Sequence, residues 1–253
     1  MRAYPKVTIL STFARDELVN ERGGFIGKQE GGPALYIKRA LEREKTPFFI
    51  MTGSKMKVRI LIKRGGEFGK ILKKSEPKSI KFSQIETPFL LISSVLDEFS
   101  LGDLADFKGK TFLDIQGYVR DGGDFGKKKL WKPRQEIFKS IFCLKGTQEE
   151  LRKIPAEYRQ AQKRKILLVT KGKRGCEVFA FGKRYSIRPS KVITGKSTIG
   201  AGDTFFAYFV SCFMKTKNVL SSAKYAVKKT SEFLSVQNIH HHNQLFRKEI
   251  GCG

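Results

Sequence analysis

Short runs of apolar residues recur along the chain, and segments with a helical repeat of apolar positions separate several of them. The apolar runs occupy residues 7–10, 48–51, 89–92, 111–115, 137–144 and 166–170. The helix-like segments occupy residues 34–44 and 148–163. Strands that are apolar throughout and alternate with helices build parallel sheets covered on both faces. The pattern predicts an α/β fold, a three-layer α/β/α sandwich around a mainly parallel sheet.

Two segments depart from this pattern. Residues 17–30 and 57–81 alternate basic and apolar positions around the glycine pairs Gly23-Gly24 and Gly65-Gly66. Such alternation indicates exposed antiparallel strands and turns. We expect them to form a small β lid over one edge of the sheet, with plain surface hairpins as the alternative. The 253 residues are predicted to form a single domain.

Three later segments have clear local patterns. Residues 177–181 and 184–187 flank Gly182-Lys183, which suits a hairpin turn. The segment after Asp203 is apolar on nearly every face, which predicts a buried helix. An amphipathic helix is expected to follow it, with Leu220, Ala223, Val227 and Leu234 on its apolar side.

The chain is strongly basic, with 50 Lys and Arg against 24 Asp and Glu and a formal net charge of +26. This charge favours anionic partners such as nucleotides, phosphorylated metabolites or nucleic acid. A compositional bias of the source organism explains the charge equally well. Basic residues 127–134, which include Trp131, motivate a nucleic-acid-binding protein as the rival class. No zinc, RRM, KH or basic-zipper signature accompanies them, so no specific nucleic-acid partner is expected.

Cysteine and histidine usage excludes several chemistries. The four cysteines contain no C-x-x-C pair, which argues against a zinc knuckle or a thioredoxin-like motif. All three histidines are consecutive, at residues 240–242, so Ser-His-Asp or Cys-His catalysis would need that run to fold back onto a nucleophile. A surface run or an accidental metal-binding tract is the simpler interpretation. No apolar run approaches the ~18 residues that span a bilayer, so we expect a soluble cytoplasmic protein without membrane contact.

The stretch from Ser197 to Phe205, with the sequence STIGAGDTF, is the most informative motif. It places Gly200, Ala201 and Gly202 where the apolar helix begins, and the free N–H groups of a helix start attract an anion. Asp203 beside an anion is costly unless a metal neutralises it or it acts as a base on a neighbouring hydroxyl, so the motif suggests phosphoryl transfer. Gly195-Lys196-Ser197 is not a P-loop, because Ser190 stands where that motif requires glycine.

Residues 200–205, GAGDTF, match the heart of the signature of the ribokinase-like, or PfkB, carbohydrate kinase family, which the chain resembles. Supporting similarities follow the family's order: Asp16, then Gly31-Gly32, then Thr147 with Glu150, then the segment TKGKRG at residues 170–175. Departures include Ser197, Thr147 and Tyr36, where the family has Asp, Asn and Asn. Residues 114–120, DIQGYVR, and 144–147, LKGT, look like the inositol kinase branch and its archaeal relatives.

The resemblance implies an ATP- and Mg²⁺-dependent kinase for a small polyol, with an inositol-like acceptor favoured and sugars or nucleosides open; a homodimer stays open as well. Asp203 would be the base, and the amides of Gly200, Ala201 and Gly202 would hold the developing charge. Glu150 would organise Mg²⁺ through water. Thr170, Gly172 and Gly175 would line the nucleotide, and the substrate would be bound by Asp16, Gly31, Gly32, Gln116 and Arg120.

Each assignment has a structural alternative. Asp203 could be only a helix cap and Glu150 an ordinary first-turn acid. The segment from Thr170 to Gly175 could be a plain strand-to-hairpin turn. Asp16 could be a surface acid, and Arg120 a solvated arginine.

Overall fold

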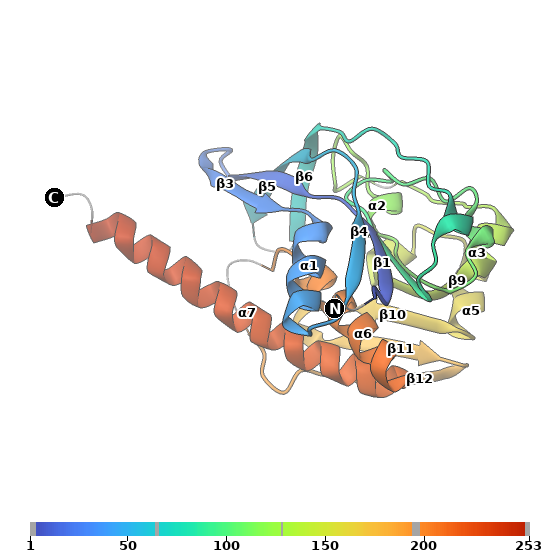
Figure 1. Cartoon of the computed structure of the whole chain (residues 1–253). Coiled ribbons are helices and arrows are strands. Elements are labelled where there is room, and N and C mark those ends of the chain that lie inside the picture. Colours follow the sequence, from blue (N-terminus) through green and yellow to red (C-terminus); the bar gives the residue numbers. More distant parts are fainter. Residues whose placement is uncertain (1–3, 64–65, 128, 194–197, 251–253) are drawn as a thin grey trace.

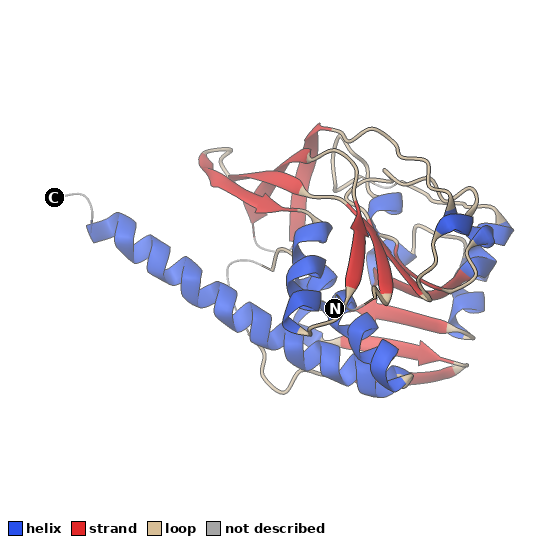
Figure 2. Cartoon of the chain, in the orientation of Figure 1, coloured by secondary structure: helices blue, strands red, loops and turns tan. Residues whose placement is uncertain are grey.

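The computed structural model describes residues 4–63, 66–127, 129–193 and 198–250, with side chains described up to residue 237 except at 63, 66 and 67. Its centre is an eight-stranded sheet in the order β12-β11-β10-β9-β8-β7-β1-β4 (Figures 1 and 2). The six strands from β10 to β4 run parallel, and β11 and β12 extend the sheet as an antiparallel hairpin. The strands are β1 (Val7–Ser11), β4 (Phe48–Met51), β7 (Phe89–Ser93), β8 (Lys110–Asp114), β9 (Ile141–Thr147), β10 (Ile166–Thr170), β11 (Cys176–Ala180) and β12 (Lys183–Ile187).

Helices cover both faces of this sheet, which gives the three predicted layers. One face is covered by α1 (Pro33–Arg43), α6 (Ala201–Thr216) and α7 (Val219–Ile250), whose apolar side chains share one core with the sheet (Figure 2). The other face is covered by α2 (Gln116–Val119), α3 (Gln135–Ser140), α4 (Gln148–Leu151), α5 (Ala156–Lys163) and the 3₁₀ turns η1 (Phe82–Gln84) and η2 (Leu104–Asp106). The mixed α/β fold class is therefore confirmed.

The two alternating segments form a second, four-stranded sheet in the order β3-β2-β5-β6. Its strands are β2 (Ala14–Val19), β3 (Phe25–Gly31), β5 (Met56–Lys63) and β6 (Gly66–Lys73). Apolar side chains of β2 and β5 pack on Val95 and Leu96, which follow strand β7 of the large sheet. This small sheet stands over the large one at the end where β1 leads into β2 (Figure 1). The predicted β lid is thus present as an element of the fold.

Three local predictions were wrong in detail. Residues 137–144 are not one strand, because Ile137 and Phe138 belong to helix α3 and the strand begins at Ile141. Residues 148–163 are two helices, because Pro155 interrupts them and becomes the N-cap of the second. The hairpin turn is Phe181-Gly182, both with positive φ, as a two-residue turn of this hand requires.

Within the described residues, no helix is both long and apolar enough to cross a bilayer.

Candidate active site

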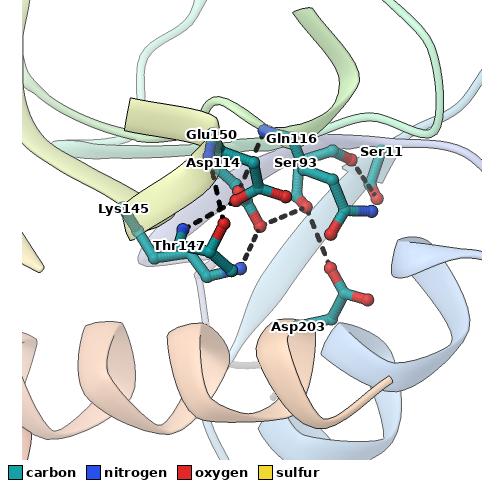
Figure 3. A network of polar contacts seen from close by, with 8 residues as sticks. All are labelled: Ser11, Ser93, Asp114, Gln116, Lys145, Thr147, Glu150 and Asp203. Carbon is teal, nitrogen blue, oxygen red and sulfur yellow. Dashed lines mark hydrogen bonds and ion pairs between the residues drawn. The ribbon is translucent and has the colours of Figure 1, made fainter. Parts of the chain in front are cut away.

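The parallel strands of the large sheet bring polar residues to one edge. Ser11, Ser93, Asp114, Thr147 and Thr170 are the last residues of β1, β7, β8, β9 and β10. Since parallel strands end on the same side of a sheet, these residues lie along its carboxyl edge, where α/β proteins bind ligands. Helix α6 begins at this edge (Figure 3).

The start of α6 depends on glycine at two positions. Gly200, the N-cap, has φ 76°, and a Cβ there would collide with the ring of Tyr36. A Cβ on Gly202 would come 2.9 Å from Nζ of Lys145. A glycine at each position therefore lets the helix start lie close against side chains from α1 and β9.

Asp203 stands in the first turn of α6 and is 9% exposed. Ser93 Oγ donates a hydrogen bond to Asp203 Oδ1 at 3.1 Å (Figure 3). Ser93 Oγ also lies 3.4 Å from Asp114 Oδ2. Ser93 is itself held by Ser11, whose Oγ donates to the Ser93 carbonyl at 2.6 Å. Asp203 is thus tied to the end of strand β7 by a buried hydroxyl, an arrangement that a simple helix cap does not need.

Lys145 is buried next to this carboxylate network. Its Nζ lies 2.6 Å from Asp114 Oδ2, and both side chains are almost fully inaccessible. Burial lowers the pKa of Lys145, but the carboxylates of Asp114, Glu150 and Asp203 outweigh burial, so the pKa of the ammonium group is raised. Lys145 therefore stays charged and offsets part of the negative charge around Asp203.

A pocket opens between the helix start and the small sheet. Its lining includes Asp16, Gly32, Gln116, Arg120, Gly200, Gly202 and Asp203, all predicted site residues. The small sheet supplies an apolar wall from Val58, Ile60 and Phe68. Residues that are far apart in the sequence therefore meet around one cavity.

The Asp16 carboxylate is buried, only 2% exposed, so the interpretation of Asp16 as a surface acid is wrong. It lies against Gly31, where a Cβ would collide with the carboxylate. Gly31 thus makes room for Asp16, whereas Gly32 lines the pocket directly. The double glycine therefore has one residue for packing and one at the cavity.

Gln116 is the first residue of α2, and Arg120 lies one helical turn further on, directly after the end of the helix. The side-chain amide of Gln116 lies 2.7 Å from Arg120 Nη2, and only the amide orientation that turns its oxygen to the guanidinium lets it accept hydrogen bonds from Arg120. The guanidinium also lies 4.2 Å from the centre of the Phe125 ring and donates to the carbonyl of Val95 at 3.4 Å. These contacts hold Arg120 at the pocket, so it is not merely solvated.

The three residues predicted to line the nucleotide lie along the same edge but do not line this pocket. Thr170 ends β10 and pairs in register with Thr147 of β9. Gly172 and Gly175 follow in the turn η3 (Gly172–Arg174) and just after it, with φ 55° and 85°. Gly172 is exposed, with no atom within 4 Å of the place a Cβ would occupy, so its backbone is open to a ligand.

Glu150 has a structural role that is visible directly. Its Oε2 accepts a hydrogen bond from the Thr147 backbone N–H at 2.7 Å, and Thr147 Oγ1 accepts one from the Glu150 N–H at 3.2 Å. This is a capping box at the start of α4. Within the described residues, no cluster of three or more His, Cys, Asp or Glu side chains could hold a metal by itself.

Sequence reasoning did not assign a role to Ser93, and it quoted Asp114 and Lys145 without one. Ser93 gave no motif, because a serine ending an apolar strand is common. Lys145 did give a signal, because it follows the apolar stretch 141–144 of a strand expected to be buried. A lysine at such a position is rarely buried without a charged partner. Ser197, part of the signature, lies outside the described residues, as do Gly195 and Lys196 and the side chains of the histidine run.

Comparison with known proteins agrees with this geometry and indicates a small-molecule kinase. Residues 126–237 match the model of the family described as pfkB family carbohydrate kinase. The match covers less than half of the chain, and over this segment the predicted resemblance is confirmed. A search of curated proteins found no match.

Solved structures with the same fold include several ribokinase-family kinases. One is a pyrophosphate-dependent kinase complexed with a pyrophosphate analog and myo-inositol, at 18% identity and a TM-score of 0.71 over 89% of this chain and 93% of that one. Another is the ribokinase of Arabidopsis thaliana with ribose and ATP, at 15% identity and a TM-score of 0.64 over 89% and 91%. The nucleoside kinase of Methanocaldococcus jannaschii is similar at 15% identity and a TM-score of 0.59 over 88% and 89%.

Proposed function

We propose that this protein transfers the γ-phosphoryl group of ATP to a hydroxyl of a small polyol, with an inositol-like acceptor favoured. The observation that carries the proposal is the convergence of Asp16, Gln116, Arg120 and Asp203 on one pocket beside the start of α6. Asp16 can accept hydrogen bonds from hydroxyls, and Arg120 can donate to them. Several such groups around one cavity suit an acceptor that carries several hydroxyls.

Asp203 would act as the base on the acceptor hydroxyl. The carboxylate lines the pocket and is oriented by Ser93. Backbone N–H groups of Gly200 and Gly202 at the start of α6 would face the charge that develops on the transferred group. The N–H of Ala201, which the sequence also suggested for this role, donates instead to the carbonyl of Thr198 at 3.0 Å. Lys145 is a positioning residue in this scheme, since its charge holds Asp114 and lies next to Gly202.

The ATP phosphates would lie along the edge formed by the ends of β9 and β10. Thr170, Gly172 and Gly175 would contact the nucleotide, and the open backbone at Gly172 fits that role. Mg²⁺, when bound, would neutralise phosphate charge. It usually keeps several waters and takes only one or two carboxylates, so Glu150 acting through water fits the lack of a larger cluster among the described residues.

A nucleoside is the second candidate acceptor, because aromatic side chains also line the pocket. Tyr36, Phe68 and Phe125 surround the same cavity. An aromatic base could pack against such rings. A polyol offers these rings only its C–H groups, so it would use less of their surface.

Phosphate-donor and acceptor assays on purified protein test the proposal. ATP and pyrophosphate are each offered with myo-inositol, ribose, fructose or adenosine, and phosphorylated product is measured by mass spectrometry. We expect ATP with myo-inositol to give the fastest turnover. The Asp203→Asn variant should lose about 10²–10⁴-fold in kcat while it still binds ATP in calorimetry, and exposed Asp106→Asn is the matched control.

Each other outcome has a definite meaning. Faster turnover with adenosine than with myo-inositol would favour the second candidate, and pyrophosphate as the better donor would replace ATP. Full activity in Asp203→Asn would refute its role as the base. Nucleic-acid binding with steep salt dependence and no turnover with any pair would favour the rival class of binding protein.

A further inference from the structure

A second cavity lies within the helical layer, between α1, α6 and α7. It has a volume of about 240 Å³ and is lined by Tyr36, Arg39, Ala40, Arg43, Thr204, Tyr208, Phe233, Val236 and Gln237. Asp203 does not line it, and only Tyr36 is shared with the first pocket. The cavity is larger than a packing void, since about 10–15 Å³ on this scale already holds a water molecule.

Two side-chain oxygen atoms on residues that line this second cavity are buried and have no hydrogen-bond partner within the described part of the chain. They are Thr204 Oγ1, on a residue that is only 2% exposed, and Gln237 Oε1. The Gln237 amide is held by its other atom, because Nε2 donates to the carbonyl of Ile199 at 3.3 Å. A buried polar atom without a partner is costly, so a ligand group that reaches either oxygen after a rotation of its side chain would remove that cost.

Positive charge gathers at the same cavity. Arg39 and Arg43 lie one turn apart on the same face of α1, a spacing at which like charges repel. Their neighbour Lys38 is paired with Glu42. Among the described residues, neither Arg39 nor Arg43 forms an ion pair, so both guanidinium groups can bind an anion.

We propose that the second cavity binds a small hydroxylated anion, such as a phosphorylated or carboxylated polyol. The anionic group contacts Arg39 and Arg43. A hydroxyl donates to Gln237 Oε1, and Thr204 Oγ1 supplies a further hydrogen bond. Tyr36, Tyr208 and Phe233 enclose the carbon skeleton.

Occupancy of the second cavity bears directly on the active site. Thr204 follows Asp203 in α6, and Gln237 holds Ile199, which precedes Gly200. Tyr36 lies between the two cavities and packs against Gly200. A bound anion is therefore positioned to change kinase turnover, as an effector does.

Calorimetric titration of the full-length protein with glycerol 3-phosphate and with glycerate tests the proposal. Glycerol and inorganic phosphate serve as partial probes. We expect saturable binding of at least one of the two anions, tighter than that of either partial probe. The Arg39→Gln/Arg43→Gln variant should weaken that binding at least about tenfold, because charge-assisted hydrogen bonds are lost.

The Arg152→Gln/Arg164→Gln variant removes the same net charge from exposed arginines outside both cavities and should bind as the wild type does. Equal affinity in the two double variants would overturn the proposal, because binding would then be a general effect of charge. Absence of saturable binding for both anions would overturn it as well. Retained circular dichroism and melting temperature in each variant establish that it is folded.

Discussion

Lys145 and Asp114 form a buried ion pair, with 2.6 Å between Nζ and Oδ2, between the neighbouring strands β9 and β8, where the two residues pair in register. Ser93 Oγ lies between this pair and Asp203, within 3.4 Å of Asp114 and 3.1 Å of Asp203. The position of Asp203, the proposed base, therefore depends through Ser93 on the ion pair of Lys145 with Asp114. No single sequence motif contains all of these residues.

Loss of Lys145 should be severe for stability. Removing one partner of a buried ion pair costs about 3–5 kcal/mol, so Lys145→Met should lower the free energy of unfolding by that amount in urea titrations. The double variant Lys145→Met/Asp114→Asn should be more stable than the sum of the single effects by about 0.5–3 kcal/mol. Exposed Lys132→Met is the control, and strict additivity would contradict the coupling.

The pH dependence of that effect has a definite sign. The folded pKa of Lys145 is raised, so its contribution to stability is present below the ordinary lysine pKa and is lost as the pH rises through the raised value. The stability difference between wild type and Lys145→Met should therefore be constant from about pH 6 to 9. It should shrink in more alkaline solution.

Ser93→Ala should change the pH profile of catalysis. The Ser93 hydroxyl donates to Asp203 and so stabilises the ionised carboxylate; without it, the pKa of Asp203 should rise. In a plot of kcat/KM against pH, the acidic limb should move to higher pH. The value of kcat should fall roughly tenfold, with little change in KM. Exposed Ser79→Ala is the control, and an unmoved acidic limb would rule out the positioning role.

Gly200→Ala tests two reasons for glycine at the start of α6: the left-handed backbone conformation and the close approach of Tyr36. A residue with a Cβ in the left-handed region costs about 1–3 kcal/mol, and here the Cβ also meets Tyr36. Gly182→Ala is a matched control, because Gly182 has φ 83° and open space around it. The free energy of unfolding should fall further in Gly200→Ala than in Gly182→Ala, and equal losses would show that the contact with Tyr36 is unimportant.

Glu150→Gln separates the capping role of this residue from its proposed metal role. Glutamine also completes a capping box, so the melting temperature should change little. If Glu150 organises Mg²⁺ through water, the concentration of Mg²⁺ needed for half-maximal activity should rise about tenfold, since a hydrogen bond to a charged group is worth roughly 1.5–3 kcal/mol. An unchanged Mg²⁺ requirement would leave only the structural role.

The sequence predicts the main sheet well because its strands are short, mostly apolar runs, as β1 and β10 show. It also predicts most pocket residues, since glycines and an acid at a helix start carry an unusual signal. It does not predict the contact of Ser93 with Asp203, because these residues are 110 positions apart and a strand-end serine has no distinctive pattern. The division near Pro155 was missed because helical periodicity continues across it.

The pocket beside Asp203 is enclosed by two different sheets, with Asp16 on the small one and Asp203 at the edge of the large one. Only two residues, Thr12 and Phe13, separate strand β1 from strand β2. Any molecule that fills the pocket therefore acts as a non-covalent cross-link between the sheets. Its binding free energy adds to their cohesion, so the small sheet resists local unfolding most when the pocket is full.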